Sequence, residues 1–305
     1  MNAPRRLPRR KLDGVLLLDK SIGVSSNHAL QVVRRLFNAD KAGHTGTLDP
    51  LATGLLPLCF GEATKFSSAL LDADKRYVAT VKLGITTETA DAEGAVINRR
   101  PVTADINDVS QAIAFFQGEI EQIPPMYSAL KRDGKPLYAY AREGIVVERS
   151  SRKIKIYQTK LLEWQGDTFV FEVLCSKGTY IRTLAADIGE RLGCGAHLLA
   201  LRRIGIGYLD IARAYTLDSL EMLDNSSRDA LLLPIEVLLN GHDSAMLSLA
   251  EAMKMKQGQA IKWAGTEGLK LKVYDEKQKF MGIAQMTPDG LLQPIRLVSG
   301  LQFED

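Results

Sequence analysis

The stretch GHTGTLDPLATGLLP, residues 43–57, is the segment around which the rest of this chain is best understood. It holds three glycines, two prolines, three threonines, one histidine and one aspartate between two apolar segments. Glycine permits backbone conformations that other residues resist, whereas proline fixes φ and lacks an N–H donor. We therefore expect a loop with a defined path, rather than a buried helix or strand, that places Asp49 and His44 at particular positions.

The dipeptide Asp49-Pro50 admits two interpretations. An aspartate commonly caps a helix whose first residue is proline. A carboxylate in a loop of defined path can also serve in catalysis, and a helix N-terminus would stabilise its negative charge. The two roles are compatible, so the residues alone leave both open.

Length and composition indicate a globular protein with more than one domain. The 305 residues are 46% hydrophobic and 25% charged, which suits one large domain and a smaller one. No apolar run approaches the roughly 20 residues that span a bilayer, and the N-terminus lacks the apolar segment of a secretory signal. Three widely spaced cysteines suit neither a disulfide framework nor a zinc site. We expect a cytoplasmic protein with reduced cysteines.

Positive charge is concentrated at the N-terminus. The net charge is +3 at pH 7, and five lysine or arginine residues precede the first acid, Asp13. The remainder of the chain is therefore slightly acidic. We predict that residues 1–12 form an unfolded basic arm, for which phosphate contact and simple solvation both remain open.

Hydrophobic patterning predicts a mixture of strands and helices up to about residue 240. Strands are expected at 14–20, 76–84, 152–164, 168–175 and 196–203. Helices are expected after a cap at Ser25 or Ser26, after a cap at Thr103, and at 179–192. The character of the sequence changes near Gly241, and residues 245–305 contain short β-like runs between polar turns. This region has eight basic and seven acidic residues, so charge does not mark it as RNA-binding.

Several further segments, taken together with residues 43–57, resemble one protein family. They are GVLLLDK (14–20), GEATKF (61–66), KRYVATVKLG (75–84), PPMYSALK (124–131), CSKGTYIRTLAADIGE (175–190) and CGAHLLALRR (194–203). Over most of residues 14–220 the chain is similar to the TruB-type pseudouridine synthases, the bacterial tRNA pseudouridine-55 synthase family. The resemblance implies an α+β catalytic domain at 13–240, with a central mixed, mostly antiparallel sheet and flanking helices. It also implies a small PUA-like RNA-binding β domain at 245–305.

The resemblance assigns three residues to catalysis. Asp49 corresponds to the catalytic aspartate of the family, Tyr77 to a tyrosine that packs against the target base, and Arg182 to the basic residue that pairs with the aspartate. Taken singly, a tyrosine near a strand start is more often a packing residue, and an arginine on a helix more often forms a structural ion pair. The joint match therefore carries these assignments.

Five further positions correspond to substrate-binding or motif residues of the family. Tyr180 and Leu201 match positions that line the uridine pocket. His44 matches a histidine that enters the RNA loop and stacks where bases are displaced. Asp91 matches an acid that contacts the RNA loop, and Lys20 matches a motif residue usually considered structural.

The implied reaction converts uridine into pseudouridine. The N1–C1′ glycosidic bond breaks, the uracil turns, and its C5 atom bonds to C1′, with no net redox change. No nicotinamide, ATP, metal or other cofactor is therefore expected, and the sequence contains no GxGxxG, no GxxxxGK[ST] and no paired metal ligands. Asp49 can act as a nucleophile or as a base on the sugar, and the sequence leaves both routes open. Arg182 can keep that carboxylate ionised, and the ring of Tyr77 can hold the detached uracil.

The implied partner is tRNA, bound through its T-stem loop with the target uridine extruded from its stack. Residues 123–144 interleave four basic side chains with three tyrosines, a combination that suits a clamp on RNA. We expect this insertion to act as a thumb, although a loop that packs on its own protein would have a similar composition. Neither a membrane nor a protein partner is expected.

The chain departs from the family pattern at Ser21, where a proline usually follows the lysine. We expect a slightly less rigid turn and retained activity. Two other functions remain open. One is a pseudouridine synthase that acts on another RNA or works with a guide RNA, and the other is an RNA-binding, tRNA-folding protein whose catalysis is secondary.

Overall fold

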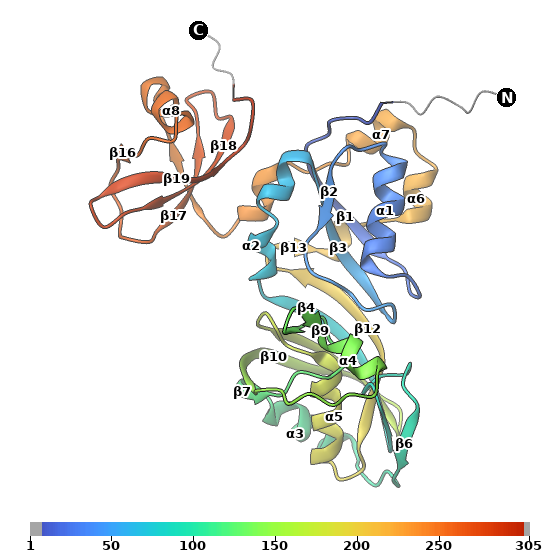
Figure 1. The fold of residues 1–305 in the computed structure, drawn as a ribbon. Coiled ribbons are helices and arrows are strands. Elements are labelled where there is room, and N and C mark those ends of the chain that lie inside the picture. Colours follow the sequence, from blue (N-terminus) through green and yellow to red (C-terminus); the bar gives the residue numbers. More distant parts are fainter. Residues whose placement is uncertain (1–7, 302–305) are drawn as a thin grey trace, which may run out of the picture.

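The computed structural model describes residues 8–301, which build a large elongated body around a ten-stranded sheet and a smaller body around a five-stranded sheet (Figure 1). The main path of the larger sheet is β14 (Tyr215–Thr216), β1 (Gly14–Lys20), β3 (Ala52–Phe60), β12 (Ala196–Ile206), β4 (Lys75–Leu83), β11 (Thr168–Cys175), β10 (Arg152–Trp164) and β7 (Gly118–Gln122). Two short strands, β2 (Ala42–His44) and β13 (Leu209–Asp210), pair with β3 and β12.

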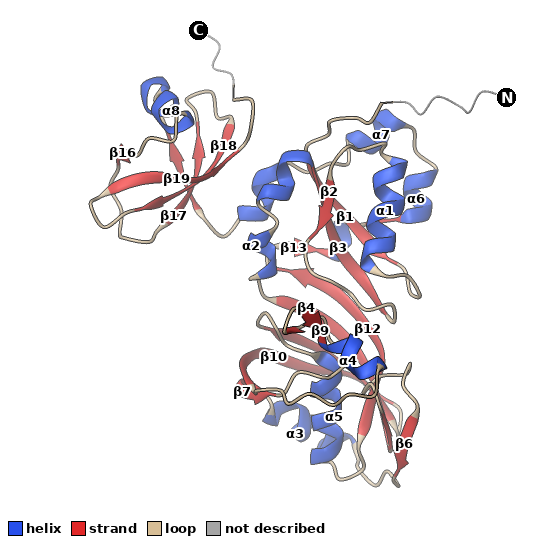
Figure 2. Cartoon of the chain, viewed as in Figure 1, coloured by secondary structure: helices blue, strands red, loops and turns tan. Residues whose placement is uncertain are grey.

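Strand direction in this sheet confirms the predicted fold class. Within residues 8–301, its strand pairs are antiparallel except β1 with β14 and β3 with β12. Helices flank the sheet along its length (Figure 2). The fold is therefore α+β with a mixed, mostly antiparallel central sheet. The expected strands at 14–20, 152–164 and 168–175 match the observed bounds of β1, β10 and β11.

Both faces of the β1–β3 half of the sheet are covered. On one face, α1 (Ser26–Leu36) and α6 (Leu217–Glu221) pack on the sheet, so that Leu30, Val33 and Leu220 share a core with Leu16 and Leu56. The other face is covered by the short elements η1 (Gly61–Lys65), α2 (Ser68–Leu71), η2 (Ile211–Arg213) and η3 (Ile235–Leu239). Each fully buried large apolar side chain contributes about 1.5–3 kcal/mol.

The other half of the sheet is covered by two helices. These are α3 (Ile106–Phe115) and α5 (Ile181–Arg191), which pack on the inward side chains of β4, β10, β11 and β12. A hairpin of β5 (Ile85–Thr87) and β6 (Val96–Arg99) projects beside them, and α7 (Asn225–Asp229) lies near α1 (Figure 1). The N-terminal end of α5 thereby meets the middle of the sheet.

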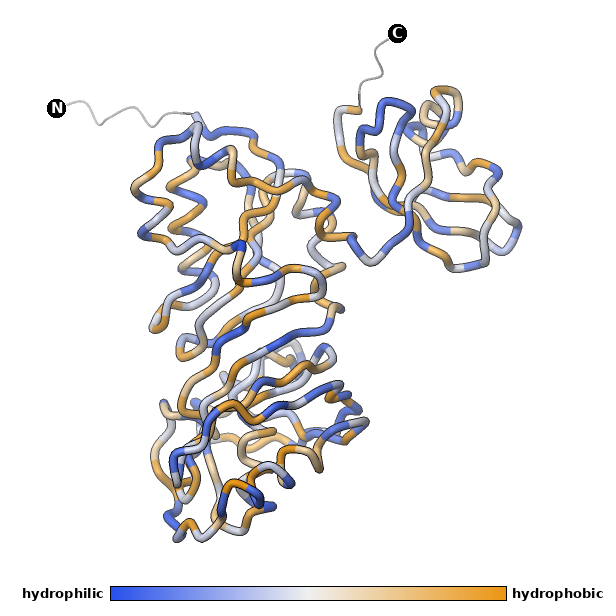
Figure 3. The backbone as a smooth tube through the Cα atoms, turned by 180° about the vertical axis from the view of Figure 1, so that it is seen from behind, coloured by the Kyte–Doolittle hydropathy of each residue, from blue (hydrophilic) through white to orange (hydrophobic). Residues whose placement is uncertain are grey.

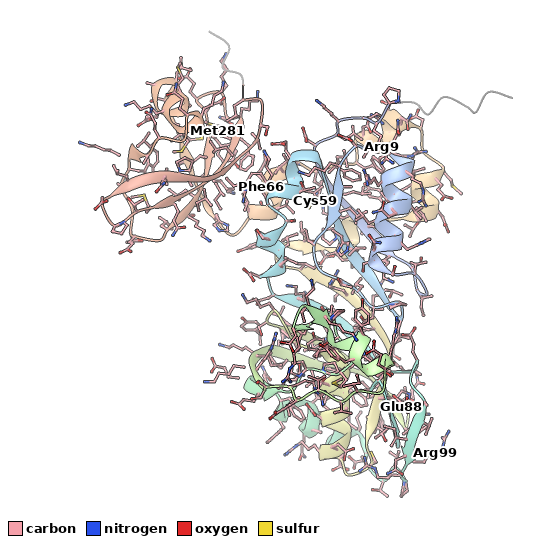
Figure 4. The ribbon with its side chains drawn as sticks, in the orientation of Figure 1. Arg9, Cys59, Phe66, Glu88, Arg99 and Met281 are labelled. Carbon is pink, nitrogen blue, oxygen red and sulfur yellow. The ribbon has the colours of Figure 1, made fainter. Side chains whose placement is uncertain are left out.

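The smaller sheet contains β15 (Asp243–Met246), β17 (Lys270–Tyr274), β18 (Phe280–Met286), β19 (Leu291–Leu297) and β16 (Ile261–Lys262), with α8 (Leu249–Lys256) packed on it. Hydrophobic stretches run through the strands of both bodies (Figure 3). At the junction the ring centroids of Phe66 and Phe280 lie 5.6 Å apart, and Lys65 Nζ donates to the Leu297 carbonyl at 3.3 Å. Figure 4 labels Phe66 where the two bodies meet. The smaller body is thus attached by packing as well as by the connecting chain.

The loop prediction for residues 43–57 is correct only for the middle of that stretch. Residues 45–51 form a loop, but residues 43–44 belong to β2 and residues 52–57 to β3, so the prediction is wrong at both ends. Leu55 and Cys59 pack into one core while Leu56 and Leu58 pack into the other. A strand buried on both faces carries apolar residues throughout, and this removes the alternation by which a strand is usually identified.

Asp49 does not cap a helix. Its carbonyl accepts a hydrogen bond from Ala52 N at 3.0 Å, which closes a turn that leads directly into β3. The interpretation of Asp49-Pro50 as a helix start is therefore wrong. The cap predicted at Ser25 is confirmed, because its side chain accepts from His28 N. The cap of α3 is Asp105 rather than Thr103, with a reciprocal contact between Asp105 and Asp108.

The predicted basic arm lies partly outside the described residues, which begin at position 8. Residues 9 and 10 contact the main body: Arg9 donates to the Ala39 carbonyl at 3.1 Å, and Arg10 forms an ion pair with Asp229. Part of the positive charge is therefore neutralised by the protein itself.

The insertion at residues 123–144 contains a small hairpin and a short helix. They are β8 (Lys131–Arg132), β9 (Lys135–Pro136) and α4 (Leu137–Arg142), drawn in green in front of the large sheet in Figure 1. Its basic and aromatic side chains contact one another: Lys135 Nζ lies 4.6 Å from the ring centroid of Tyr140, and the Arg142 guanidinium 5.3 Å from that of Tyr138. The thumb role stays a prediction.

β3 and β12 leave no room for a side chain at Gly54, which pairs with Arg203. A Cβ atom at this position would lie 2.2 Å from the Arg203 carbonyl oxygen, and the Gly54 φ of +99° is one that other residues rarely adopt. We predict that Gly54→Ala lowers the free energy of unfolding by at least about 2 kcal/mol, from strain and steric clash together. Urea denaturation would measure the change.

Gly43→Ala provides the matched control, because a Cβ atom there meets nothing closer than 3.9 Å. We expect this variant to stay within about 1 kcal/mol of the parent. Equal losses for the two variants would contradict the close approach at Gly54.

Candidate active site

A pocket of about 190 Å³ opens where β4, β12, the 45–51 loop and the N-terminal end of α5 meet. Asp49, Tyr77, Tyr180, Arg182 and Leu201 all line it, so the structure brings together five of the predicted site residues. The other residues lining the pocket are Thr47, Leu48, Ala52, Ser128, Ala129, Thr179 and Ile181. His44, Asp91 and Lys20 do not line it.

Arg182 lies at the centre of this site, in the first turn of α5, with its side chain 9% exposed. Its Nη2 atom is 3.0 Å from Asp49 Oδ2, and its Nη1 atom is 3.2 Å from Asp91 Oδ2. The same guanidinium donates to the Tyr127 carbonyl at 2.7 Å and to the Thr89 carbonyl at 3.3 Å. Four acceptors therefore fix its orientation, and with it the position of the Asp49 carboxylate.

The two carboxylates that meet Arg182 differ in exposure. The side chain of Asp49 is 51% exposed, whereas that of Asp91 is 4% exposed. Asp91 also accepts hydrogen bonds from Thr89 Oγ1 and from Glu93 N. Asp91 therefore supplies a buried counter-charge for Arg182. Its implied contact with the RNA loop stays a prediction.

Tyr77 and Leu201 reach the pocket from adjacent strands. Leu201 of β12 pairs with Ala79 of β4, and Arg203 pairs with Tyr77, so both side chains lie on the face of the sheet that carries α5. Burial raises the pKa of the Tyr77 phenol, and the nearby Arg203 charge opposes that rise. A protonated hydroxyl and an aromatic ring therefore form one wall of the pocket.

Tyr180 is fixed by its main chain. Its N–H donates to Gln122 Oε1 at 2.8 Å, and its carbonyl accepts from Gln122 Nε2 at 3.1 Å. Gln122 belongs to β7, so the far end of the sheet sets the position of the residue that precedes α5. Burial raises the pKa of the Tyr180 phenol. The pocket thus has a second neutral aromatic side chain.

His44 and Lys20 lie outside the pocket, at the ends of β2 and β1. His44 ends β2 and is half-buried, and this burial, followed by the Arg203 charge, lowers the pKa of its imidazole. Lys20 is buried, and its Nζ donates to the carbonyls of Ser21 and Val24 at 2.9 and 2.7 Å. Burial lowers the pKa of Lys20 to about 8. The Lys20 side chain therefore holds the turn that contains Ser21. The family usually has a proline at position 21.

The sequence did not reveal two residues of this region, Ser128 and Arg203. Both lie within segments quoted above, PPMYSALK and CGAHLLALRR. Ser128 is 5% exposed and lines the pocket, and Arg203 is 1% exposed behind it. Arginine is almost never fully buried unless it is paired, so a basic residue near a strand end is expected to be exposed. No sequence pattern indicated that these two side chains would be buried at the pocket.

The arrangement can bind a planar base and act on the atom next to it. Asp49 offers a carboxylate oxygen to the pocket while Arg182 holds the other, and two tyrosines and a leucine provide apolar surface. Over residues 8–301 no group of three or more His, Cys, Asp or Glu side chains is placed to hold a metal ion. None of the helices in this range is long and apolar enough to cross a membrane.

Models of three related families match this chain between residues 34 and 298. Residues 34–181 match the family described as "TruB family pseudouridylate synthase (N terminal domain)". Residues 182–240 match "tRNA pseudouridylate synthase B C-terminal domain", and residues 244–298 match "Pseudouridine synthase II TruB, C-terminal".

Two relatives and one solved structure are similar to this chain over most of its length. A Burkholderia mallei protein named tRNA pseudouridine synthase B is 53% identical over 304 residues, which covers 97% of each chain. A Cupriavidus metallidurans protein of the same name is 52% identical over 305 residues, with the same coverage. A chain in the structure titled "Crystal Structure of a Cbf5-Nop10-Gar1 Complex" superposes with a TM-score of 0.74 at 26% identity, covering 93% of this chain and 84% of that one.

The different burial of the two carboxylates leads to a stability prediction. Asp91→Ala removes a buried partner of a buried guanidinium, so we expect it to lower the free energy of unfolding by about 3 kcal/mol. Asp49→Ala removes a half-exposed partner and is expected to cost less than about 1 kcal/mol. Urea denaturation of both variants at one pH compares them. A larger loss for Asp49→Ala than for Asp91→Ala would show that Asp91 is not the structural partner of Arg182.

Proposed function

Because the chain belongs to the TruB family of pseudouridylate synthases, we propose that it isomerises uridine to pseudouridine at position 55 in the T loop of tRNA. One observation carries the proposal: the Asp49 carboxylate is held by Arg182 inside a pocket lined by Tyr77 and Tyr180. A carboxylate between aromatic walls fits a reaction in which a uracil ring detaches, turns and reattaches to its sugar.

The isomerisation changes two bonds of the uridine and uses one carboxylate oxygen of the pocket. The N1–C1′ bond of uridine breaks and the C5–C1′ bond forms, while the hydrogen on C5 is lost and N1 gains one. Arg182 holds Oδ2 of Asp49, so Oδ1 remains for the sugar. There it acts as a nucleophile at C1′ or as a base on a sugar proton, and the geometry is compatible with both routes.

The walls of the pocket keep the uracil in place during the reaction. The ring of Tyr77 offers an aromatic face, and its neutral hydroxyl adds no charge that would repel an electron-rich base. Leu201 and Tyr180 confine the base from other sides. Confinement favours reattachment over loss of the free base to solvent.

A uridine inside a folded RNA loop has to leave its stack before it can enter this pocket. His44 is suited to fill the vacated space, because its imidazole ring is planar and burial lowers its pKa, which favours the neutral form. The thumb at 123–144 would close on the T-stem loop, and the β domain at 245–305 would hold the acceptor end of the tRNA. We assign no role to residues 1–12, and we place the protein in the cytoplasm with tRNA as its only required partner.

Asp49→Asn tests the catalytic role. The amide is neither a nucleophile nor a base, so we expect pseudouridine formation to fall by at least about 10³-fold while tRNA affinity changes by less than about threefold. Mass mapping of tRNA after incubation gives the first quantity, and filter retention gives the second. Turnover like that of the parent would refute the role of Asp49.

Asp167→Asn is the matched control for this experiment. The side chain of Asp167 is also 51% exposed and also forms an ion pair, with Lys82 at 2.5 Å, but it does not line the pocket. The Asp167→Asn variant is expected to form pseudouridine as fast as the parent. A comparable loss in this variant would indicate a general effect of removing a surface carboxylate.

The substrate preference leads to a further prediction. We expect an isolated T-arm hairpin to be modified at position 55 by the purified protein alone, because the pocket, the thumb and the Asp49 loop all belong to one chain. Quantitative mapping of pseudouridine in the hairpin measures this. Activity that appears only with a guide RNA or a partner protein would favour a synthase of a different type. If growth of a strain that lacks this gene were restored equally by the parent and by Asp49→Asn, a tRNA-folding role would be favoured.

A further inference from the structure

Arg203 is a buried cation that the proposed chemistry leaves unused. It lies on β12, it is 1% exposed, and it is among the largest fully buried side chains of the described residues. Within residues 8–301 its guanidinium donates to three carbonyl groups, and no carboxylate is within ion-pair distance. Burying a charge is costly unless it is paired and hydrogen-bonded, so the groups that this guanidinium binds are informative.

The carbonyl partners of Arg203 lie on both sides of Asp49. Its Nε donates to the Leu55 carbonyl at 2.8 Å, its Nη1 to the Thr47 carbonyl at 3.5 Å and its Nη2 to the Gly46 carbonyl at 3.4 Å. The first of these bonds is short and the other two are long, so Leu55 is the firm anchor. Together they tie the start of the 45–51 loop to the following strand β3, and Asp49 lies between these contacts.

Arg203 also lies beside Tyr77. The two residues are register partners on adjacent antiparallel strands, so their side chains lie side by side on the same face of the sheet. The Arg203 charge is close enough to the phenol to oppose the rise of the Tyr77 pKa that burial causes. A guanidinium can only donate, so towards Arg203 the phenol oxygen can serve only as an acceptor. Arg203 is therefore placed to influence the Tyr77 hydroxyl as well as the loop.

We propose that Arg203 is a positioning residue for the isomerisation: its guanidinium sets the Asp49 loop and the Tyr77 hydroxyl relative to each other. This inference rests on the proposed function, because it assigns Arg203 to the same reaction. Arg182 holds the Asp49 carboxylate from the α5 side, and Arg203 holds the loop backbone from the β12 side. Neither contact alone determines both the position and the direction of the carboxylate.

The neighbouring Arg202 lies on the same strand but does not contact the Asp49 loop. Its side chain points to the opposite face, where its Nη1 and Nη2 atoms bind the two oxygens of Asp19 at 3.0 and 2.6 Å. That side chain is 42% exposed and forms an ordinary bidentate ion pair. Arg202 is therefore a matched control, one residue away on the same strand.

Comparison of Arg203→Lys with Arg202→Lys tests the proposal. Lysine keeps the charge but cannot reproduce the planar fork that reaches Leu55, Thr47 and Gly46 together. We expect Arg203→Lys to lower kcat at least about tenfold, with KM and tRNA affinity within about twofold of the parent. Arg202→Lys is expected to change none of these by more than about twofold. A parent-like kcat for Arg203→Lys would overturn the proposal.

A double-mutant cycle separates positioning from general stability. If Arg203 acts partly through the Tyr77 hydroxyl, Arg203→Lys will reduce kcat less in a Tyr77→Phe background than in the parent. A merely structural defect would reduce kcat by the same factor in both backgrounds, and that additive result would overturn the coupling to Tyr77.

A spectroscopic measurement remains decisive if Arg203→Lys does not fold. In the parent protein the Nε–H signal of Arg203 in a nitrogen-15 NMR spectrum is expected to exchange slowly with solvent. It should shift in Tyr77→Phe and stay unchanged in Tyr274→Phe, which alters the smaller sheet. The proposal would be overturned if the Arg203 Nε–H exchanged fast with solvent, or if its chemical shift were unchanged in Tyr77→Phe. A parent protein that fails to modify tRNA would instead defeat the proposed function and leave these spectra interpretable.

Discussion

The candidate site depends on one buried guanidinium. Arg182 is placed by the first turn of α5, where it meets the buried carboxylate of Asp91 and the half-exposed carboxylate of Asp49. Asp91 offsets the cost of burying the positive charge, and the remaining donors are then directed at Asp49 and at the carbonyls of Thr89 and Tyr127. The carboxylate that faces the pocket is therefore oriented by a guanidinium that is itself largely buried and paired with a buried carboxylate.

The large sheet brings these groups together from distant parts of the chain. β3 and β12 run parallel and nearly touch at Gly54, which places the loop of Asp49 beside Tyr77 and Leu201. β7 fixes Tyr180 through Gln122, and Tyr180 immediately precedes the helix that carries Arg182. The loop is thus held by one arginine from the helix side and another from the strand side. A pocket built in this way keeps its geometry before substrate arrives, as catalysis by a single carboxylate requires.

Much of this fold could be predicted from the sequence, for reasons that are local. β1, β10 and β11 are continuous or alternating apolar runs between turn residues, and Ser25 is a strong helix cap. The prediction was wrong at residues 52–57 because β3 is covered on both faces and contains Gly54 and Pro57, which usually interrupt strands. It was also wrong about the helix cap at Asp49, since the turn into β3 makes use of the same Asp-Pro pair.

The site itself was predictable only in part. Asp49, Tyr77 and Arg182 came from resemblance, and the structure brings them to one pocket. The pairing of Arg182 with Asp91 joins positions 91 residues apart, and local sequence patterns cannot predict such a contact. The burial of Arg203 contradicts the usual preference of arginine for the surface, so only the packing of β12 against the loop could reveal it.

The most direct test of the account is a quantitative map of pseudouridine in bulk tRNA from cells with and without this protein. The account predicts that pseudouridine at position 55 of the T loop is present in the first sample and absent from the second, while pseudouridines at other tRNA positions are unchanged. Restoring the gene should restore the modification. An unchanged level at position 55 in cells that lack the protein would contradict the assignment.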